Sequence, residues 1–111
     1  MEQATIQDFM KLDIRVGTVL SVSRNDRIRN PSYVLSIHFG ELGVLTSAAQ
    51  VTALYSPEGL TGKQVIAVVN FPARQIADVS SECLVLGLPQ ENGEVVLLQP
   101  ERKVQNGNRV S

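Results

Sequence analysis

The chain has 111 residues, of which 43% are hydrophobic, and its formal net charge is −1. This length predicts one compact domain that buries roughly two-thirds of its unfolded surface, with no room for a second domain. Because acidic and basic residues nearly balance, the molecule as a whole has no basic excess to attract phosphate. Any anion site must therefore be a local patch.

The first predicted element is a short helix near the N-terminus. Thr5 and Asp8 have the spacing of a capping box, in which the hydroxyl and the carboxylate accept hydrogen bonds from free N–H groups. Phe9 and Met10 follow as apolar anchors. We expect one or two helical turns here.

A long strand is predicted over residues 13–23, DIRVGTVLSVS. Its even-numbered residues from Ile14 to Val22 fall on one face at period two, and Gly17 and Val19 fall on the other. A glycine inside a strand indicates a bulge or a bend, which small closed sheets use to turn corners.

Two more strands and a second short helix are predicted next. SYVLSIHF, residues 32–39, repeats the alternation, and GELG offers a reversal into GVLTSAA, residues 43–49. AQVTALYSPEGLTG, residues 49–62, breaks the alternation with a proline and glycines and predicts a short helix with a turn. The side chains of the second strand expected to point inward are Tyr33, Leu35, Ile37 and Phe39.

The second half of the chain predicts two or three further strands. KQVIAVVN, residues 63–70, is almost continuously apolar, as expected for a strand covered on both sides. CLVLGLP, residues 83–89, and EVVLLQP, residues 94–100, flank the turn QENG. This order of elements suits an all-β, five-stranded barrel of the oligonucleotide/oligosaccharide-binding (OB) type with short flanking helices, in one domain over residues 1–111. An open β-sandwich is the alternative.

A polar segment, NFPARQIADVSSECLVLG, residues 70–87, lies between two of these apolar runs. A turn of two to five residues would be enough to join two strands, so the longer segment calls for another purpose. Phe71, at its entrance, is the aromatic residue expected to be partly free to stack on a base.

Residues suited to catalysis or metal binding are scarce. The chain has no CxxC, HExxH, GxSxG or glycine-rich phosphate loop. His38, the only histidine, has no sequence neighbour to orient it as a base and is interpreted as an exposed strand residue. Cys83 begins an apolar run without nearby cations, which favours a small buried side chain. We expect a protein that is not an enzyme and has no metal or cofactor.

Two features bear on the cellular compartment. The single cysteine excludes an intramolecular disulfide and agrees with a reducing environment. The N-terminal segment MEQATIQDFMKLD carries acidic residues and no long apolar run, so we expect neither a signal peptide nor a membrane anchor. A cytoplasmic protein is the expectation.

The segment RNDRIRN, residues 24–30, is a local concentration of positive charge. It places Arg24, Arg27 and Arg29 around Asp26, so three cations and one anion leave +2. In an OB barrel the loop between the first two strands borders the binding groove. Phosphate contact and an ordinary solvated loop are both open interpretations.

Particular segments carry a resemblance that covers nearly the whole chain: LDIRVGTV, NPSYVLSIHFGELG, TSAAQVT, GKQVIAVVNFPARQIA, SSECLVLG and VVLLQPERKVQNGNRVS. In them the sequence resembles the CsaA family, stand-alone members of the tRNA-binding domain class. That module is also attached to methionyl- and phenylalanyl-tRNA synthetases and to a synthetase-associated cytokine. The resemblance implies an OB barrel, a homodimer, tRNA binding without much sequence reading, and a chaperone-like role with exported proteins.

The resemblance also implies an RNA-binding groove. Asn70, Arg74, Ser81 and Glu82 match the family's groove-lining positions, where amide, guanidinium and hydroxyl groups contact phosphate and ribose. Glu82 itself would orient an arginine or accept a ribose hydroxyl, and a structural ion pair is the alternative. The full set of candidate RNA-binding residues is Arg15, Arg29, Ser47, Gln50, Asn70, Arg74, Ser81 and Glu82.

Other members of this set also have structural alternatives. Ser47 and Gln50 would form the facing wall of the groove, but both have side chains able to cap the following helix. Arg15 fits the family's D-x-R-V-G signature, and a salt bridge with Asp13 or another acid is the alternative.

Five positions depart from the family pattern. The family commonly has arginine, glycine, lysine, serine and lysine where this chain has, in that order, Gln75, Asp78, Ser80, Ala48 and Asn30. Three cations are missing and one anion is added, so RNA binding is expected to be weaker than in a typical member. Binding of peptides in apolar pockets depends less on these changes.

Two functions therefore follow from the sequence. The first is a non-catalytic, homodimeric tRNA-binding protein with a possible chaperone role for unfolded or exported polypeptides. The second is an export chaperone or protein-interaction module in which RNA binding is vestigial. For the dimer, the helix at Phe9 and Met10 and the tail 100–111 lie outside the five strands and are expected to be available for a twofold interface.

Overall fold

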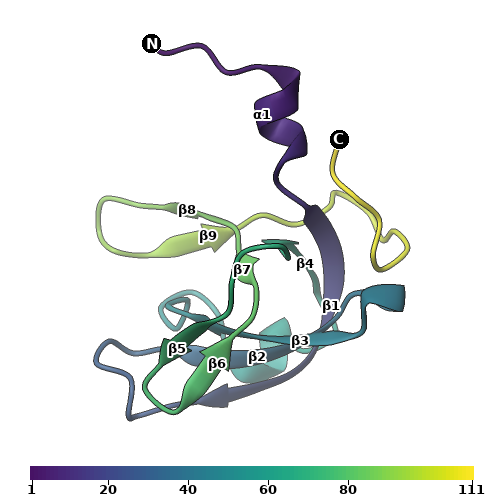
Figure 1. Cartoon of the computed structure of the whole chain (residues 1–111). Coiled ribbons are helices and arrows are strands. Elements are labelled where there is room, and N and C mark those ends of the chain that lie inside the picture. The colour runs from purple at the N-terminus through teal and green to yellow at the C-terminus, as the bar shows by residue number, and fades with distance from the viewer.

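The computed structural model describes all 111 residues and contains a curled antiparallel sheet of five strands, in the order β3-β2-β1-β4-β7 (Figure 1). The strands close into a nearly complete barrel, and the helix α2 lies between the third and fourth of them in the chain, as predicted for the OB type. The predicted all-β barrel is confirmed and the open sandwich is wrong. The five strands are β1 (Ile14–Arg24), β2 (Tyr33–His38), β3 (Val44–Ala49), β4 (Gln64–Val68) and β7 (Leu84–Val85).

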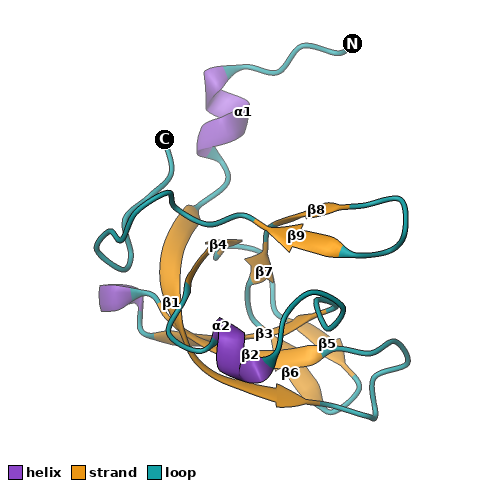
Figure 2. Ribbon diagram, turned by 180° about the vertical axis from the view of Figure 1, so that it is seen from behind, coloured by secondary structure: helices purple, strands orange, loops and turns teal.

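Two hairpins and three short helices complete the structure. Both hairpins are separate two-stranded sheets that project from the barrel (Figures 1 and 2). The hairpin strands are β5 (Arg74–Ile76) with β6 (Val79–Ser81), and β8 (Gly87–Pro89) with β9 (Val95–Leu97). The helices are α1 (Ile6–Met10), the 3-10 helix η1 (Gly40–Leu42) and α2 (Pro57–Leu60). None of the helices has the length and apolar character needed to cross a membrane.

The predicted capping box at the start of α1 is confirmed. The backbone N–H of Asp8 donates to Thr5 Oγ1 at 3.1 Å, and the backbone N–H of Thr5 donates to Asp8 Oδ2 at 2.9 Å. The helix projects away from the barrel, and none of its residues is buried (Figure 1). Local capping, not packing, therefore sets where α1 begins.

The long strand β1 confirms the predicted strand but not its predicted faces. The pairing of β1 with β2 shifts register between Val19 and Ser21, so a bulge interrupts the alternation and leaves Leu20 48% exposed. Val19 is fully buried, on the same side as Gly17. A Cβ on Gly17 would lie 2.7 Å from the Ile37 side chain, so this glycine serves close packing and the bulge lies three residues further on.

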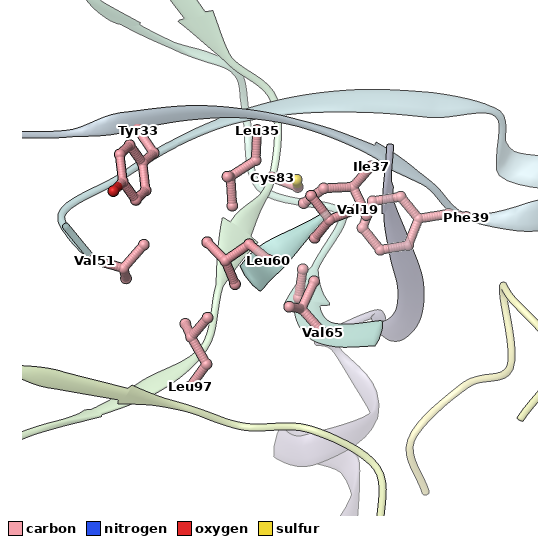
Figure 3. Close-up of a cluster of buried hydrophobic side chains, with 11 residues drawn as sticks. Val19, Tyr33, Leu35, Ile37, Phe39, Val51, Leu60, Val65, Cys83 and Leu97 are labelled. Carbon is pink, nitrogen blue, oxygen red and sulfur yellow. The ribbon is translucent and has the colours of Figure 1, made fainter. Parts of the chain in front are cut away.

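The core fills the barrel between β2, α2 and β4 (Figure 3). The inward face predicted for the second strand is confirmed, since all four of its expected residues are buried. Leu60 of α2 is fully buried and points into the same cluster, so the helix plugs one end of the barrel. The cluster consists of Val19, Tyr33, Leu35, Ile37, Phe39, Val51, Leu60, Val65, Ala67, Cys83 and Leu97.

The C-terminal tail pairs with the first part of β1, where β2 does not reach. The N–H of Val16 donates to the carbonyl of Asn108 at 3.1 Å, and the N–H of Val110 donates to that of Ile14 at 2.8 Å. Residues 107–110 are thus bound within the chain itself. The side chains of Asn108, Arg109 and Val110 stay exposed, so the expectation that the tail takes part in a twofold interface stays a prediction.

Candidate nucleic-acid interface

The polar segment that follows β4 is a β-hairpin and not a loop. Arg74 pairs with Ser81, and Ile76 pairs with Val79, around a two-residue turn. Ala77 in this turn has φ 53°, in the left-handed region that glycine usually occupies. Each strand has three residues and the turn has no glycine, so the usual hairpin signals are absent. The only sequence feature that indicated a hairpin is the apolar pair that flanks the turn, Ile76 and Val79.

The end of this hairpin and the two residues after it close the barrel against β3 along a short contact, which we call the seam: residues 46–48 of β3 against residues 81–83. A single backbone hydrogen bond crosses the seam, from the N–H of Glu82 to the carbonyl of Thr46 at 2.7 Å. The Glu82 carboxylate returns the contact by accepting the N–H of Thr46 at 2.9 Å. Glu82 therefore occupies the place of a missing ladder bond.

Two serines complete the seam. The Ser47 hydroxyl, 1% exposed, donates to the carbonyl of Cys83 at 3.0 Å. Across from it, the Ser81 hydroxyl accepts the backbone N–H of Ala48 at 3.1 Å. Three of the candidate RNA-binding side chains, Ser47, Ser81 and Glu82, are thus engaged in satisfying backbone groups of the barrel.

Two further candidates hold the chain ends in place. The Asn70 amide accepts the N–H of Asp13 and donates to the carbonyl of Lys11, both at 2.8 Å. Arg15 forms an ion pair with Asp13 and donates to the carbonyl of Gly107 at 3.0 Å. The hydrogen bond from Arg15 is the main cause that lowers the pKa of the Asp13 carboxyl. Of the two interpretations of Arg15, the structure therefore shows the salt bridge with Asp13.

The three remaining candidates are Arg29, Gln50 and Arg74. All three are exposed, and none forms a hydrogen bond or an ion pair through its side chain. Arg29 lies in the loop after β1, Gln50 directly follows β3, and Arg74 begins β5. These side chains are free to contact a ligand.

A pocket of about 180 Å³ lies beside Arg74, between the hairpin and the seam. Phe71 in its wall is 44% exposed, so the prediction of a partly free aromatic ring is confirmed. An exposed ring next to an unpaired guanidinium suits an unstacked base and its phosphate. The pocket is lined by Ala48, Phe71, Pro72, Arg74, Ile76, Ser81, Glu82, Cys83 and Leu84.

The loop after β1 is tied to the hairpin by an aspartate that the sequence identified as an added anion. Asp78 accepts a hydrogen bond from the Asn25 amide at 2.9 Å and forms an ion pair with Arg27 at 3.0 Å. The hydrogen bond from Asn25 is the main cause that lowers the pKa of Asp78. One arginine of the basic loop is thereby neutralised, whereas Arg24 and Arg29 have no acidic partner.

The groups with potential for catalysis are used structurally. Burial raises the pKa of the Cys83 thiol to about 11, so the thiol is neutral at physiological pH and a poor nucleophile. His38 is half-buried, and its Nδ1 accepts the backbone N–H of Gly40 at 3.1 Å. No group of three or more His, Cys, Asp or Glu side chains lies close enough together to hold a metal ion.

Comparisons with known proteins agree with this architecture. The family model described as a putative tRNA-binding domain matches residues 14–109. The crystal structure of the chaperone CsaA from Bacillus anthracis is 47% identical, with a TM-score of 0.94, over 99% of this chain and 100% of that one. The CsaA chaperone from Picrophilus torridus is 43% identical, with a TM-score of 0.91, over 98% of this chain and 100% of that one.

Longer proteins share the same module. A methionine–tRNA ligase from Porphyromonas gingivalis is 33% identical over 110 residues, which are 98% of this chain and 16% of the ligase. The chain thus spans about a sixth of the length of the curated relatives it matches. A protein related to methionyl-tRNA synthetase from Pyrococcus horikoshii is 28% identical, with a TM-score of 0.88, over the whole of both chains.

Proposed function

The chain belongs to the tRNA-binding domain family and, within it, to the CsaA group, and we propose on this basis that it is a non-catalytic, cytoplasmic protein that binds tRNA. The RNA lies along the side of the barrel that carries the β5–β6 hairpin and the basic loop after β1. Its contacts are to phosphate and to unstacked bases. The observation that carries the proposal is the unpaired Arg74 beside the pocket of Phe71.

Arg74 is suited to phosphate because nothing in the protein neutralises it. It is the only cation between Lys63 and Arg102 in the sequence, and its side chain forms no ion pair. Phosphate is recognised strongly by a guanidinium because the hydrogen bonds are charge-assisted and can be bidentate. The half-exposed ring of Phe71 offers any base a stacking surface, irrespective of its identity.

The shortage of free hydrogen-bonding side chains explains why little sequence would be read. Reading base edges requires amides, hydroxyls and carboxylates that are not already engaged. In this chain Asn70, Ser47, Ser81 and Glu82 all bond to backbone groups of the protein. Of the candidate amides and hydroxyls only Gln50 is left free, so phosphate contact and stacking dominate, and both are tolerant of sequence.

Replacement of Arg74 by alanine tests the proposal. We expect Arg74→Ala to weaken binding of bulk tRNA by about 1.5–3 kcal/mol, or roughly ten- to a hundredfold, because a charge-assisted hydrogen bond is lost. The slope of log K against log salt should fall by roughly 0.7–0.9, the contribution of one phosphate contact. Titrations at several salt concentrations measure both quantities.

Two controls accompany this variant. Arg74→Lys keeps the charge, so its salt slope should match that of the parent even if affinity falls. Lys11→Ala removes an exposed cation of the N-terminal segment, paired with Asp8, and should bind like the parent. Unchanged affinity and slope for Arg74→Ala would show that the hairpin does not bind RNA.

We also propose that the protein is a homodimer with a chaperone role for unfolded or exported polypeptides. Two observations support this extension: both CsaA structures are named chaperones, and α1 carries an unpartnered apolar face. Ile6 is 72% exposed and Met10 is 49% exposed, and their spacing of four places them on the same side of the helix. A second chain would cover this face.

Separate measurements address these two points. Sedimentation should find a species of twice the monomer mass, and Met10→Glu should shift it toward monomer. For the chaperone role, suppression of aggregation of an unfolded substrate is measured with and without tRNA. Suppression that tRNA does not compete away, in a protein without salt-dependent tRNA binding, would favour the alternative of an export chaperone with vestigial RNA binding.

A further inference from the structure

The cations of this protein divide into two groups of equal size. Of the ten lysines and arginines, half form ion pairs: Lys11, Arg15, Arg27, Arg102 and Arg109. The other half form none: Arg24, Arg29, Lys63, Arg74 and Lys103. Three of the unpaired cations lie on the basic loop or the hairpin already described. The remaining two, Lys63 and Lys103, are far apart in sequence and line one cavity elsewhere on the barrel.

This cavity, of about 360 Å³, has no hydrophobic residue in its lining and shares no lining residue with the pocket beside Arg74. Glu101 forms an ion pair with the adjacent Arg102, so this acid is already neutralised, and the hydrogen bond from Arg102 lowers its pKa. The two lysines are left as the uncompensated charge. The cavity is lined by Thr18, Gly62, Lys63, Gln64, Gln99, Pro100, Glu101, Arg102 and Lys103.

Hydrogen bonds hold the backbone at the two lysines in position. The Gln64 side chain donates to the carbonyl of Val104 at 2.7 Å and accepts the N–H of Val104 at 3.0 Å, as a peptide group in a ladder would. Lys103 is therefore fixed next to the start of β4. The carbonyl of Lys63 accepts the N–H of Val19 of β1 at 2.9 Å, which fixes the opposite wall. The backbone on both walls of the cavity is thus held in place by the protein itself.

We propose that the Lys63–Lys103 cavity binds a phosphate group of the RNA backbone, as a second contact separate from the Arg74 hairpin. The cavity has no aromatic wall for a base, and its uncompensated charges are ammonium groups, which act as point charges toward phosphate. A contact of this kind adds affinity and orients the RNA without reading sequence. The inference rests on the proposed function, because the phosphate belongs to the same tRNA that Arg74 is proposed to contact.

The positions of the two contacts define how the RNA lies. In Figures 1 and 2 the β5–β6 hairpin and the C-terminal segment extend from different sides of the barrel. An RNA that contacts both the hairpin and the cavity therefore reaches two sides of the barrel and is not confined to one groove.

The test is the double variant Lys63→Ala/Lys103→Ala, compared with the matched single-lysine control Lys11→Ala. Bulk tRNA is titrated at several salt concentrations. The double variant should bind roughly three- to tenfold more weakly at low salt, with a salt slope lower by about 0.7–1.8, the contribution of one or two phosphate contacts. Lys63→Arg/Lys103→Arg keeps both charges and should bind like the parent. Thermal unfolding of each variant verifies that the fold is intact, and Lys63→Gln/Lys103→Gln replaces the alanine variant if it is not.

The outcomes separate this inference from the proposed function. If the parent protein shows no salt-dependent binding of tRNA, the proposed function itself fails. If the parent binds and Arg74→Ala weakens binding, but the double variant retains the parent's affinity and slope, the cavity is not a phosphate site. Loss of aggregation suppression in the double variant, with tRNA binding intact, would overturn the inference in favour of an acidic polypeptide.

Discussion

The two sides of the barrel are closed by different kinds of contact. On one side β1 forms long backbone ladders, with six paired residues toward β2, interrupted by one bulge, and five toward β4. On the other side, the seam between β3 and residues 81–83 has one backbone hydrogen bond, and side chains of two serines and a glutamate supply the rest. A ladder needs only backbone atoms, whereas a seam of this kind requires particular side chains.

This difference explains which polar residues are available to RNA. An edge strand such as β3 exposes N–H and C=O groups that must find partners, and the seam side chains are those partners. Residues that resemble ligand-binding positions are thus engaged in closing the fold. Arg74 on the hairpin, and the two lysines of the Lys63–Lys103 cavity, form no ion pair within the protein.

The largest expected effect is a loss of stability on the side of the barrel where β1 pairs with β2 and β4. Gly17→Ala should lower the free energy of unfolding by about 3 kcal/mol, because the new methyl would meet the buried side chains of Ile37 and Phe39 in a core without space. Chemical denaturation measures the loss. Gly43→Ala is the comparison in an open position, where a Cβ meets nothing within 4 Å but φ is +83°, so its cost is backbone strain alone. Equal stability of Gly17→Ala and the parent would contradict this packing.

The next largest effect is the loss of stability when a side-chain hydrogen bond of the seam is removed. Ser47→Ala should cost about 1–3 kcal/mol, since it leaves the buried carbonyl of Cys83 without its hydrogen-bond donor. Ser21→Ala is the matched control, because Ser21 is exposed on β1. If both serine variants have the stability of the parent, the seam does not depend on Ser47. Alkylation of Cys83 should also become faster in Ser47→Ala, as the seam opens more often.

A smaller effect concerns the contact between the hairpin and the basic loop. Asp78→Asn releases Arg27 from its ion pair and should tighten tRNA binding by about 0.5–1 kcal/mol, roughly two- to fivefold, with stability almost unchanged because the pair is exposed. Asp26→Asn makes the same charge change in an exposed residue that pairs with no cation. If both variants tighten binding equally, the effect is one of net charge and not of a released arginine.

The smallest expected effect on stability at neutral pH comes from the buried thiol of Cys83, beside the seam. The unfolded thiol titrates near 9.0 and the folded one at about 11, so the unfolded state loses its proton first as pH rises. The free energy of unfolding should therefore fall between pH 9 and 11, by up to about 1.4 kcal/mol per pH unit. Cys83→Ala should lack this part of the pH dependence. Denaturation of both proteins at pH 7, 9 and 10.5 measures the difference, and parallel curves would contradict the assignment.

Local sequence determined much of the fold. The Thr5–Asp8 capping box, the alternation of the second strand and the Pro57–Gly59 helix start each depend on residues within a few positions of one another. The five-stranded barrel followed from the order of these elements. The resemblance to the CsaA family, given by continuous segments of sequence, agrees with the family and structural matches.

The predictions that failed concern features that depend on contacts between residues far apart in the sequence. The faces of β1 depend on a bulge set by its pairing with β2, and the hairpin depends on strands too short to show a period. Glu82 lies 36 residues from Thr46 in the chain, and Arg27 lies 51 residues from Asp78. Whether a polar side chain is free for RNA depends on such partners. The sequence alone supplied the residue types, and only the tertiary structure brought the partners within hydrogen-bonding distance.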